Sequence, residues 1–191
     1  MKLKYKILPF YEFNEKDLIA KPIDNKDIEF IRLCRNSQKD ILRQNQNISK
    51  SDQINYFKTQ IWPQLLLDNP TIILFSLFRN NEIIGYGGLV NISWENRRAE
   101  VSYLVSKNIV QNKQEYIKNF NDFINLIKKI SFYHLSLNRL FTETYDMRPL
   151  HVSILENNGF KYEGRLKSHI IINKKEIDSL IHGCLNKNYE I

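Results

Sequence analysis

The middle of the chain carries a pattern that few folds can accommodate. Residues 97–105 (RRAEVSYLV) alternate, with Glu100 and Ser102 on one face and apolar side chains on the other, which predicts a strand with one buried face. Residues 114–130 have apolar side chains at helical spacing and predict an amphipathic helix. Residues 139–145 (RLFTETY) predict a second strand. A strand, a helix and a second strand in this order indicate a βαβ crossover at the centre of the fold.

Shorter elements are predicted on both sides of this crossover. Before it we expect strands at residues 2–13 and 18–23, a helix at 24–35, a second helix opened by Ser49 or Ser51, and a hairpin from strands at 71–78 and 82–91. After it we expect a helix at 149–158 and strands at 160–166 and 176–185, with Asn173 and Lys174 in the connecting turn. The fold class is therefore α+β, a mixed central sheet flanked by helices. We expect one domain over residues 1–191, in which residues 1–16 form an extra N-terminal strand.

Composition excludes several classes of function. The net charge is +7, but no run of five or six basic residues occurs, so we expect no nucleic acid partner. Cys34 and Cys184 lie far apart, and neither they nor the histidines have the spacing of metal ligands, so we expect no disulfide and no metal. No apolar run approaches the about 18 residues that cross a bilayer, and no signal peptide is evident. We expect a cytoplasmic protein without a membrane partner.

The C-terminal third contains the most specific sequence motif. The sequence LNRLFTETYDMRPLHVSILENNGFKYEGRL, followed by INKKEIDSLIHGCL, resembles the GCN5-related N-acetyltransferase (GNAT) superfamily, in which a helix ending LE-x-x-GF-x-x-EG-x-L precedes a final hairpin. The resemblance covers residues 17–187. The segment CRNSQKDILRQNQNISKSDQINYF is similar to the branch that acetylates nucleotide-linked amino sugars, and the nearest other branch acetylates the N-termini of ribosomal proteins.

This resemblance implies a GNAT fold and a reaction in which an amine attacks the thioester of acetyl-CoA. A neutral amine is required, so a carboxylate that accepts its proton would help. Glu100 is the first candidate for this base and Glu143 the second, whereas the structural alternative for Glu100 is an ion pair with Arg97 or Arg98. Family members often place a Tyr where this chain has Leu155, so the acid for the leaving thiolate is Tyr145, His151, Ser153 or solvent.

The resemblance also implies a site for CoA. Backbone groups of Leu104, Val105 and Ser106 would pair with pantetheine. The pyrophosphate loop of the family is rich in glycine, but residues 110–115 (VQNKQE) contain none. In its place, Gln111, Asn112 and Lys113 would bind phosphate. Arg148 and His151 are further CoA-binding candidates, although Arg148 could instead pair with Asp146.

Residues for the acceptor follow from the front of the chain. Arg35 and Asn36 are expected to contact substrate, unless they only close the first helix. The leading hypothesis is an N-acetyltransferase acting on a nucleotide-linked amino sugar, a small-molecule substrate. The alternatives are a protein N-terminal acetyltransferase and a degenerate GNAT-fold binding or regulatory module that no longer uses CoA. A homodimer is compatible with each of them.

Overall fold

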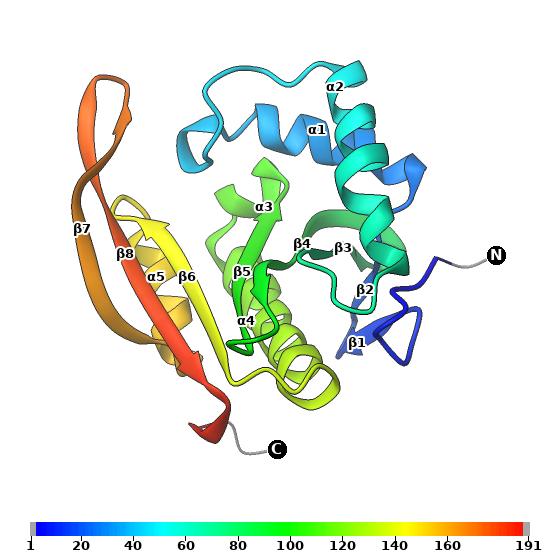
Figure 1. The fold of residues 1–191 in the computed structure, drawn as a ribbon. Coiled ribbons are helices and arrows are strands. Elements are labelled where there is room, and N and C mark those ends of the chain that lie inside the picture. The colour runs from blue at the N-terminus through cyan, green and yellow to red at the C-terminus, as the bar shows by residue number, and fades with distance from the viewer. Residues whose placement is uncertain (1–2, 189–191) are drawn as a thin grey trace.

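The computed structural model describes residues 3–188, and one mixed sheet runs through them (Figure 1). Its strand order is β1-β2-β3-β4-β5-β6-β8-β7, and every neighbouring pair is antiparallel except β5 and β6. The strands are β1 (Phe13–Glu15), β2 (Leu18–Pro22), β3 (Ile73–Arg79), β4 (Glu82–Ser93), β5 (Arg98–Val105), β6 (Arg139–Tyr145), β7 (Lys161–Ile172) and β8 (Lys175–Leu185). The predicted α+β class and the central crossover are confirmed.

Helices cover both faces of this sheet. They are α1 (Ile28–Asn36), α2 (Lys50–Tyr56), α3 (Lys107–Gln111), α4 (Lys113–Lys128) and α5 (Pro149–Asn157). Short 3-10 and π-helical turns complete the set, at Asn25–Asp27, Lys39–Ile41, Phe57–Ile61, Trp62–Leu66, Lys129–His134 and Asn186–Asn188. The buried side chains form two clusters, one between α1, α2 and the sheet and a larger one between α4, α5 and the opposite face.

The N-terminal prediction needs a correction. The strand expected over residues 2–13 is confined to Phe13–Glu15, and Lys2 lies outside the described residues. The preceding segment instead packs Tyr5 and Leu8 into the core, where the Tyr5 hydroxyl donates to Leu74 O and accepts from Leu74 N–H. Residues 3–12 pair with no strand of the sheet, and the apolar composition that suggested a strand is explained by the burial of Tyr5 and Leu8.

A second correction concerns the segment between β5 and α4. It was expected to be a loop, but residues 107–111 form the short helix α3. The last hairpin is also longer than predicted, because β7 continues to Ile172. Its turn is as predicted: Asn173 and Lys174 both have positive φ (51° and 65°), which a type I′ turn requires.

The parallel pair β5 and β6 separates soon after it forms. Only three residue pairs join these strands, Arg98 with Arg139, Ala99 with Leu140, and Glu100 with Phe141. Beyond Glu100, the remaining five residues of β5 have no partner on β6, although they stay paired with β4. The sheet therefore opens into a gap, which lies between the adjoining β5 and β6 ribbons in Figure 1.

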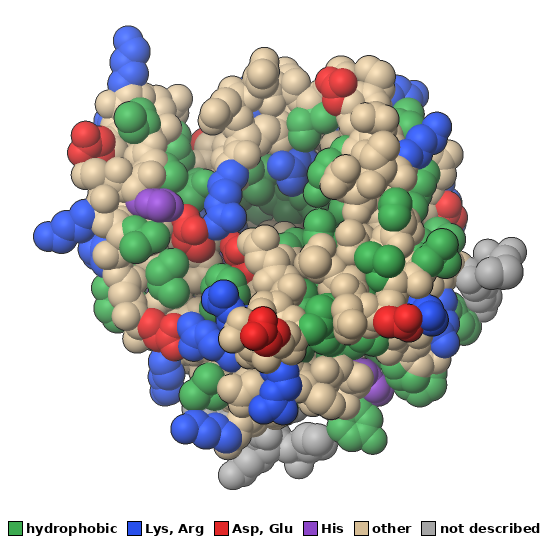
Figure 2. Space-filling view, in the orientation of Figure 1, with side chains coloured by type: hydrophobic (Ala, Val, Ile, Leu, Met, Phe, Trp, Pro, Cys, Tyr) green, Lys and Arg blue, Asp and Glu red, His purple; other side chains and the backbone are tan. Residues whose placement is uncertain are grey.

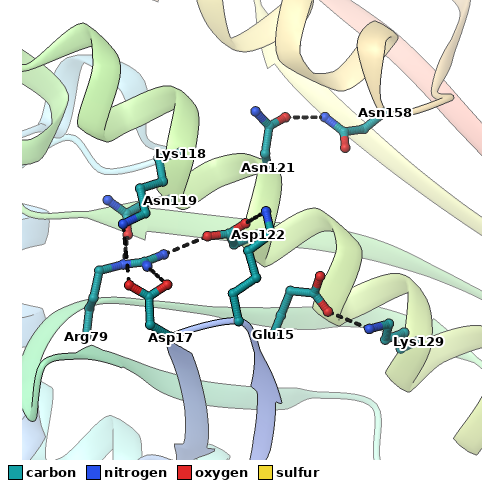
Figure 3. A network of polar contacts seen from close by, with 10 residues as sticks. Glu15, Asp17, Arg79, Lys118, Asn119, Asn121, Asp122, Lys129 and Asn158 are labelled. Atoms are coloured by element: carbon teal, nitrogen blue, oxygen red, sulfur yellow. Dashed lines mark hydrogen bonds and ion pairs between the residues drawn. The ribbon is translucent and has the colours of Figure 1, made fainter.

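A buried polar network fixes α4 against the other side of the sheet (Figure 3). Arg79, at the end of β3, donates to the Asn119 amide oxygen (2.9 Å), to Asp122 (2.8 Å) and to Asp17. Lys16 adds a further bond to Asp122 (2.7 Å). These contacts join the β1–β2 turn, β3 and α4, so they hold the helix that connects β5 to β6.

Candidate active site

A cavity of about 220 Å³ lies where β5 and β6 separate. Strands, helices and the loop after α1 all contribute to its lining, which includes three arginines and two glutamates: Arg35, Arg43, Arg148, Glu100 and Glu143. A larger groove of about 770 Å³ adjoins it through Leu42, Arg43 and Tyr145 and runs toward the tip of the β7–β8 hairpin. Figure 2 shows this face of the molecule hollowed near its centre, with hydrophobic side chains at the floor and charged ones around the rim.

Two carboxylates converge on one arginine at this cavity. The guanidinium of Arg43 lies 3.3 Å from Glu100 and 2.5 Å from Glu143. Glu100 projects from β5 and also accepts from Asn91 Nδ2 (2.7 Å), while Glu143 projects from β6 and accepts from Ser179 Oγ (2.9 Å). Glu100 thus pairs with Arg43 and not with Arg97 or Arg98. The side chain of Arg43 is 56% exposed, so it can leave the carboxylates without unfolding the core.

Arg35 and Asn36 have different surroundings. Arg35 lines the cavity and donates to Gln44 Oε1 (3.1 Å) and to the Tyr86 hydroxyl (2.7 Å). Asn36 donates to Ile48 O (3.0 Å), while its carbonyl oxygen accepts from Gln44 and from Ile48 N–H (both 2.9 Å). Asn36 therefore clamps the loop that carries Arg43 and lines only the outer groove.

The opposite side of the gap presents a second polar group. Tyr116 of α4 bonds His151 Nδ1 (2.7 Å) and accepts from Arg148 (2.9 Å), so α4 and the start of α5 are joined by side-chain contacts. The His151 ring is stacked on Phe120. Burial, helped by the charge of Arg148, lowers the pKa of His151 well below its ordinary value, so the imidazole is neutral at pH 7.

The backbone of β5 offers groups to this gap at alternate residues. The Ser106 N–H donates to Ile84 O on the β4 side (2.9 Å). Alternation along the strand then turns the backbone of Leu104 toward β4 as well, and that of Tyr103 and Val105 toward the gap. The Val105 carbonyl accepts from the Gln38 side chain (2.8 Å). Of the three predicted backbone contacts, only Val105 faces the gap.

The segment expected to bind pyrophosphate has no concave loop. Asn112 has φ −95° and its side chain accepts from Glu115 N–H (3.2 Å), so this residue caps the N-terminus of α4. Gln111, Lys113 and Glu115 are exposed. Phosphate would therefore meet the side-chain charge of Lys113 here, while the Asn112 cap already occupies the Glu115 N–H.

The candidate acids differ in whether they line the cavity. Tyr145 lines the cavity, and burial raises the pKa of its phenol, which keeps the proton on its oxygen near neutral pH. Ser153 is exposed on α5, outside the residues that line the cavity, and Leu155 is fully buried in the core.

Several residues of the site had no signal in the sequence. Arg43 lies in an irregular loop and meets its partners across 57 and 100 positions of the chain. Tyr116 lies within the predicted helix at 114–130, and Gln38 lies between the two helices predicted before the hairpin, so neither was among the candidate site residues. Contacts between residues so far apart in sequence produce no periodic pattern. Hydrophobic periodicity predicts the type of a local helix or strand, but not which other residues that helix or strand contacts.

Neither a metal site nor a membrane span emerges from the described residues. Within residues 3–188, no three His, Cys, Asp or Glu side chains cluster in a way that could hold a metal ion. Over the same part of the chain, no helix has the length and apolarity needed to span a bilayer.

Two comparisons with known proteins found matches, one with a family model and one with solved structures. Residues 21–181 match the family model described as an acetyltransferase (GNAT) domain. Spermidine N-acetyltransferase from Vibrio cholerae in complex with CoA and spermine superposes with a TM-score of 0.76 at 21% identity, over 90% of this chain and 96% of that one. The dodecameric form of the same enzyme in an intermediate state gives a TM-score of 0.75 at 20% identity, over 91% and 96% of the two chains. None of the curated proteins matches this sequence.

Proposed function

We propose that this chain acetylates the primary amine of a small molecule in the cavity between β5 and β6. The premise is that the chain belongs to the GNAT family of acetyltransferases and is an N-acetyltransferase that acts on amines. The observation that carries this proposal is the placement of Glu100 and Glu143. They lie on neighbouring strands at the point where those strands separate, on the lining of the cavity.

The family uses acetyl-CoA, and the residues present fit that molecule. The Tyr103 hydroxyl and Thr142 Oγ1 are buried without a hydrogen-bond partner among the described residues, and Tyr103 and Thr142 both line the cavity. Together with the backbone of Tyr103 and Val105, they offer a polar slot to an extended amide chain such as pantetheine. Arg148, Lys113 and Lys107 would hold the phosphates by charge. When bound, acetyl-CoA supplies the activated acetyl group.

The protein side of the reaction then has two proton-handling positions. Glu100 accepts the proton that the amine loses, and Asn91 fixes the orientation of its carboxylate. Glu143 is the second acceptor on the neighbouring strand. Tyr145 retains its proton because burial raises its pKa, so the phenol can donate to a leaving thiolate. Arg43 must move aside from the carboxylates before an ammonium group can approach them.

The identity of the acceptor is the finer part of the proposal. The resemblance of the sequence to two branches of the family suggests a nucleotide-linked amino sugar or a protein N-terminus, and the similar structure in complex with spermine suggests a polyamine. The cavity of about 220 Å³, entered from a groove, supports a small molecule. Self-association is part of the proposal, because a similar structure is dodecameric, and light scattering on the purified protein will measure it.

The test begins with calorimetric titration of acetyl-CoA and CoA. We expect binding in the micromolar range and a loss of affinity of about 10-fold or more in Lys113→Ala and Arg148→Ala, because each removes a charge-assisted contact. In a thiol-release assay with a panel of amines, Glu100→Gln should lower kcat by about 100-fold or more.

The matched control is Glu95→Gln, on the exposed turn between β4 and β5, which should leave both readouts unchanged. Absence of binding at millimolar acetyl-CoA would refute the proposal and favour a GNAT-fold module that no longer uses CoA. Full activity of Glu100→Gln would refute the role of Glu100 but not the rest of the proposal.

A further inference from the structure

We propose that the acceptor carries an anionic group, a carboxylate or a phosphate, close to its amine, and that Arg35 binds this group. The inference rests on the proposed function, because it concerns the acceptor side of the same cavity. An acceptor of this class differs from purely cationic acceptors such as polyamines.

Arg35 is a partly buried cation that lacks a counter-ion. Its two hydrogen bonds go to neutral groups, Gln44 Oε1 (3.1 Å) and the Tyr86 hydroxyl (2.7 Å). Among residues 3–188, no carboxylate pairs with it within 4.0 Å. A charge that is partly withdrawn from water and not paired is costly, so a bound anion is the natural complement.

The other two arginines that line this cavity have a carboxylate partner or a role assigned toward CoA. Arg43 pairs with both Glu100 and Glu143, so its charge is compensated. Arg32, on the same helix as Arg35, pairs with Glu29 (2.7 Å). Arg148 also lines the cavity and donates to Tyr116 of α4 (2.9 Å), and the proposed function assigns it to a phosphate of CoA. Arg35 is thus the arginine of this cavity that has neither a carboxylate partner among residues 3–188 nor an assigned role toward CoA.

The geometry of Arg35 also prepares it for an anion. A guanidinium has five N–H donors. Two are used, by Gln44 and Tyr86, which leaves three for a ligand and fixes the orientation of the plane. A planar donor fork of this kind binds carboxylate or phosphate oxygens in pairs.

The position of Arg35 places such an anion beside the reacting centre. Arg35 and Glu100 line the same cavity, so an amine near Glu100 and an anion near Arg35 can belong to one small molecule. Arg35 also lines a second, more apolar cavity of about 390 Å³ between α1, α2 and β4, formed in part by Ile31, Tyr56 and Phe57. The remainder of a larger acceptor can extend into this second space.

The experiment compares amines that differ only in the anion. O-phosphoethanolamine is matched with ethanolamine, β-alanine with β-alaninamide, and spermidine represents a polycation. Thiol release is measured with wild-type protein, Arg35→Gln, Arg35→Lys, and Arg97→Gln, which removes one exposed charge on the β4–β5 turn as the control.

We expect kcat/KM to be at least about 10-fold higher for the anionic member of a pair, mainly through KM. Arg35→Gln should abolish that preference, Arg35→Lys should restore part of it, and Arg97→Gln should retain it. The pair with the larger preference identifies phosphate or carboxylate as the group recognised.

A second measurement does not depend on turnover. The Nε–Hε signal of Arg35 is followed by ¹⁵N NMR while O-phosphoethanolamine or β-alanine is added to the protein with CoA. A saturable shift supports the inference. It is overturned if the neutral or polycationic amines are preferred in wild-type protein, if the anion preference survives in Arg35→Gln, or if neither anion shifts the signal while acetyl-CoA binds. Loss of acetyl-CoA binding with a retained Arg35 shift would instead refute the proposed function and leave the anion site in place.

Discussion

Arg79 shows how one residue can hold a helix on a sheet. Its side chain is 7% exposed and its guanidinium bonds Asp122, whose side chain is 1% exposed. Asn119 and Asp17 occupy other donors of the same group, and the hydrogen bond from Arg79 lowers the pKa of Asp17 to about 2. A buried arginine compensated in this way is costly to disturb, because removal of one partner leaves a buried charge with neither a counter-ion nor solvent around it.

We expect Asp122→Asn to lower the free energy of unfolding by about 3 kcal/mol, because it removes the buried carboxylate that Arg79 and Lys16 share. Urea denaturation followed by circular dichroism measures this change. The matched control is Asp68→Asn, whose ion pair with Lys6 is exposed and should be worth less than about 0.5 kcal/mol. Equal effects in the two variants would show that the network in Figure 3 contributes no more than a surface pair.

Single residues of the cavity differ in how far the sequence predicted them. Glu100 was placed on the correct face of its strand, because alternation determines which side chains share a face. That Glu143 lies beside it depends on the β5–β6 register, which was inferred from the βαβ pattern and the GNAT resemblance. Arg43 could not be predicted, because no periodic pattern reports where an irregular loop lies relative to a sheet. The roles of these residues remain predictions.

At the scale of elements, the N-terminus of α4 departs from the glycine-rich arrangement expected of the family. The Asn112 side chain accepts the N–H of Glu115, which in a glycine-rich loop would be free for phosphate. The segment before it is folded into α3, which the sequence did not predict because five residues show no helical period. The capping of α4 and its phosphate-binding capacity therefore compete for the same donor.

Replacement of Asn112 by Ala should separate stability from ligand binding. We expect the free energy of unfolding to fall by about 1 kcal/mol, since a side-chain N-cap is lost. Affinity for CoA should be retained or rise, because the Glu115 N–H is released. Urea denaturation and calorimetry on the same preparation give both values. Lys113→Ala is the converse variant, with an expected loss of CoA affinity at nearly unchanged stability. A large fall in CoA affinity of Asn112→Ala would contradict this account.

Among the longer elements, prediction succeeded where burial repeats along the sequence. The amphipathic stripe identified α4 to within two residues at its C-terminal end, because its apolar face is buried along its length. The extension of β7 was missed because most of its side chains are exposed, so that neither face of the strand has the apolar alternation that marks burial.

The whole molecule keeps its two thiols inside. Cys34 lies in the cluster beneath α1 and α2, and Cys184 lies in the larger cluster beneath α4 and α5. Burial raises the pKa of Cys34 from 9.0 to about 11, and it raises the pKa of Cys184 as well. A thiol whose pKa is raised by folding stabilises the folded state below its unfolded pKa, and this contribution is lost as pH rises toward the folded pKa.

Stability should therefore fall above about pH 9, the value for an unburied thiol, and continue to fall toward pH 11. The free energy of unfolding, measured in urea at intervals from pH 7 to pH 10, gives the slope. Cys34→Ala removes the thiol, so the loss between pH 8 and pH 10 should be smaller than in wild type by about 1 kcal/mol. Comparing slopes, and not absolute stabilities, cancels the cost of the cavity that the substitution leaves. Identical slopes would show that Cys34 does not titrate in this way.

The gap between β5 and β6 has a consequence for the order in which the chain assembles. The strands on one side of it, β1 to β5, come from residues 13–105, and those on the other side, β6 to β8, come from residues 139–185. Each side is thus built from neighbours in sequence, and three residue pairs join them. During vectorial synthesis on the ribosome, the first side can form before the second has left the exit tunnel. The cavity that holds Glu100 and Glu143 would then be completed only after β6 to β8 have emerged and docked against the first side.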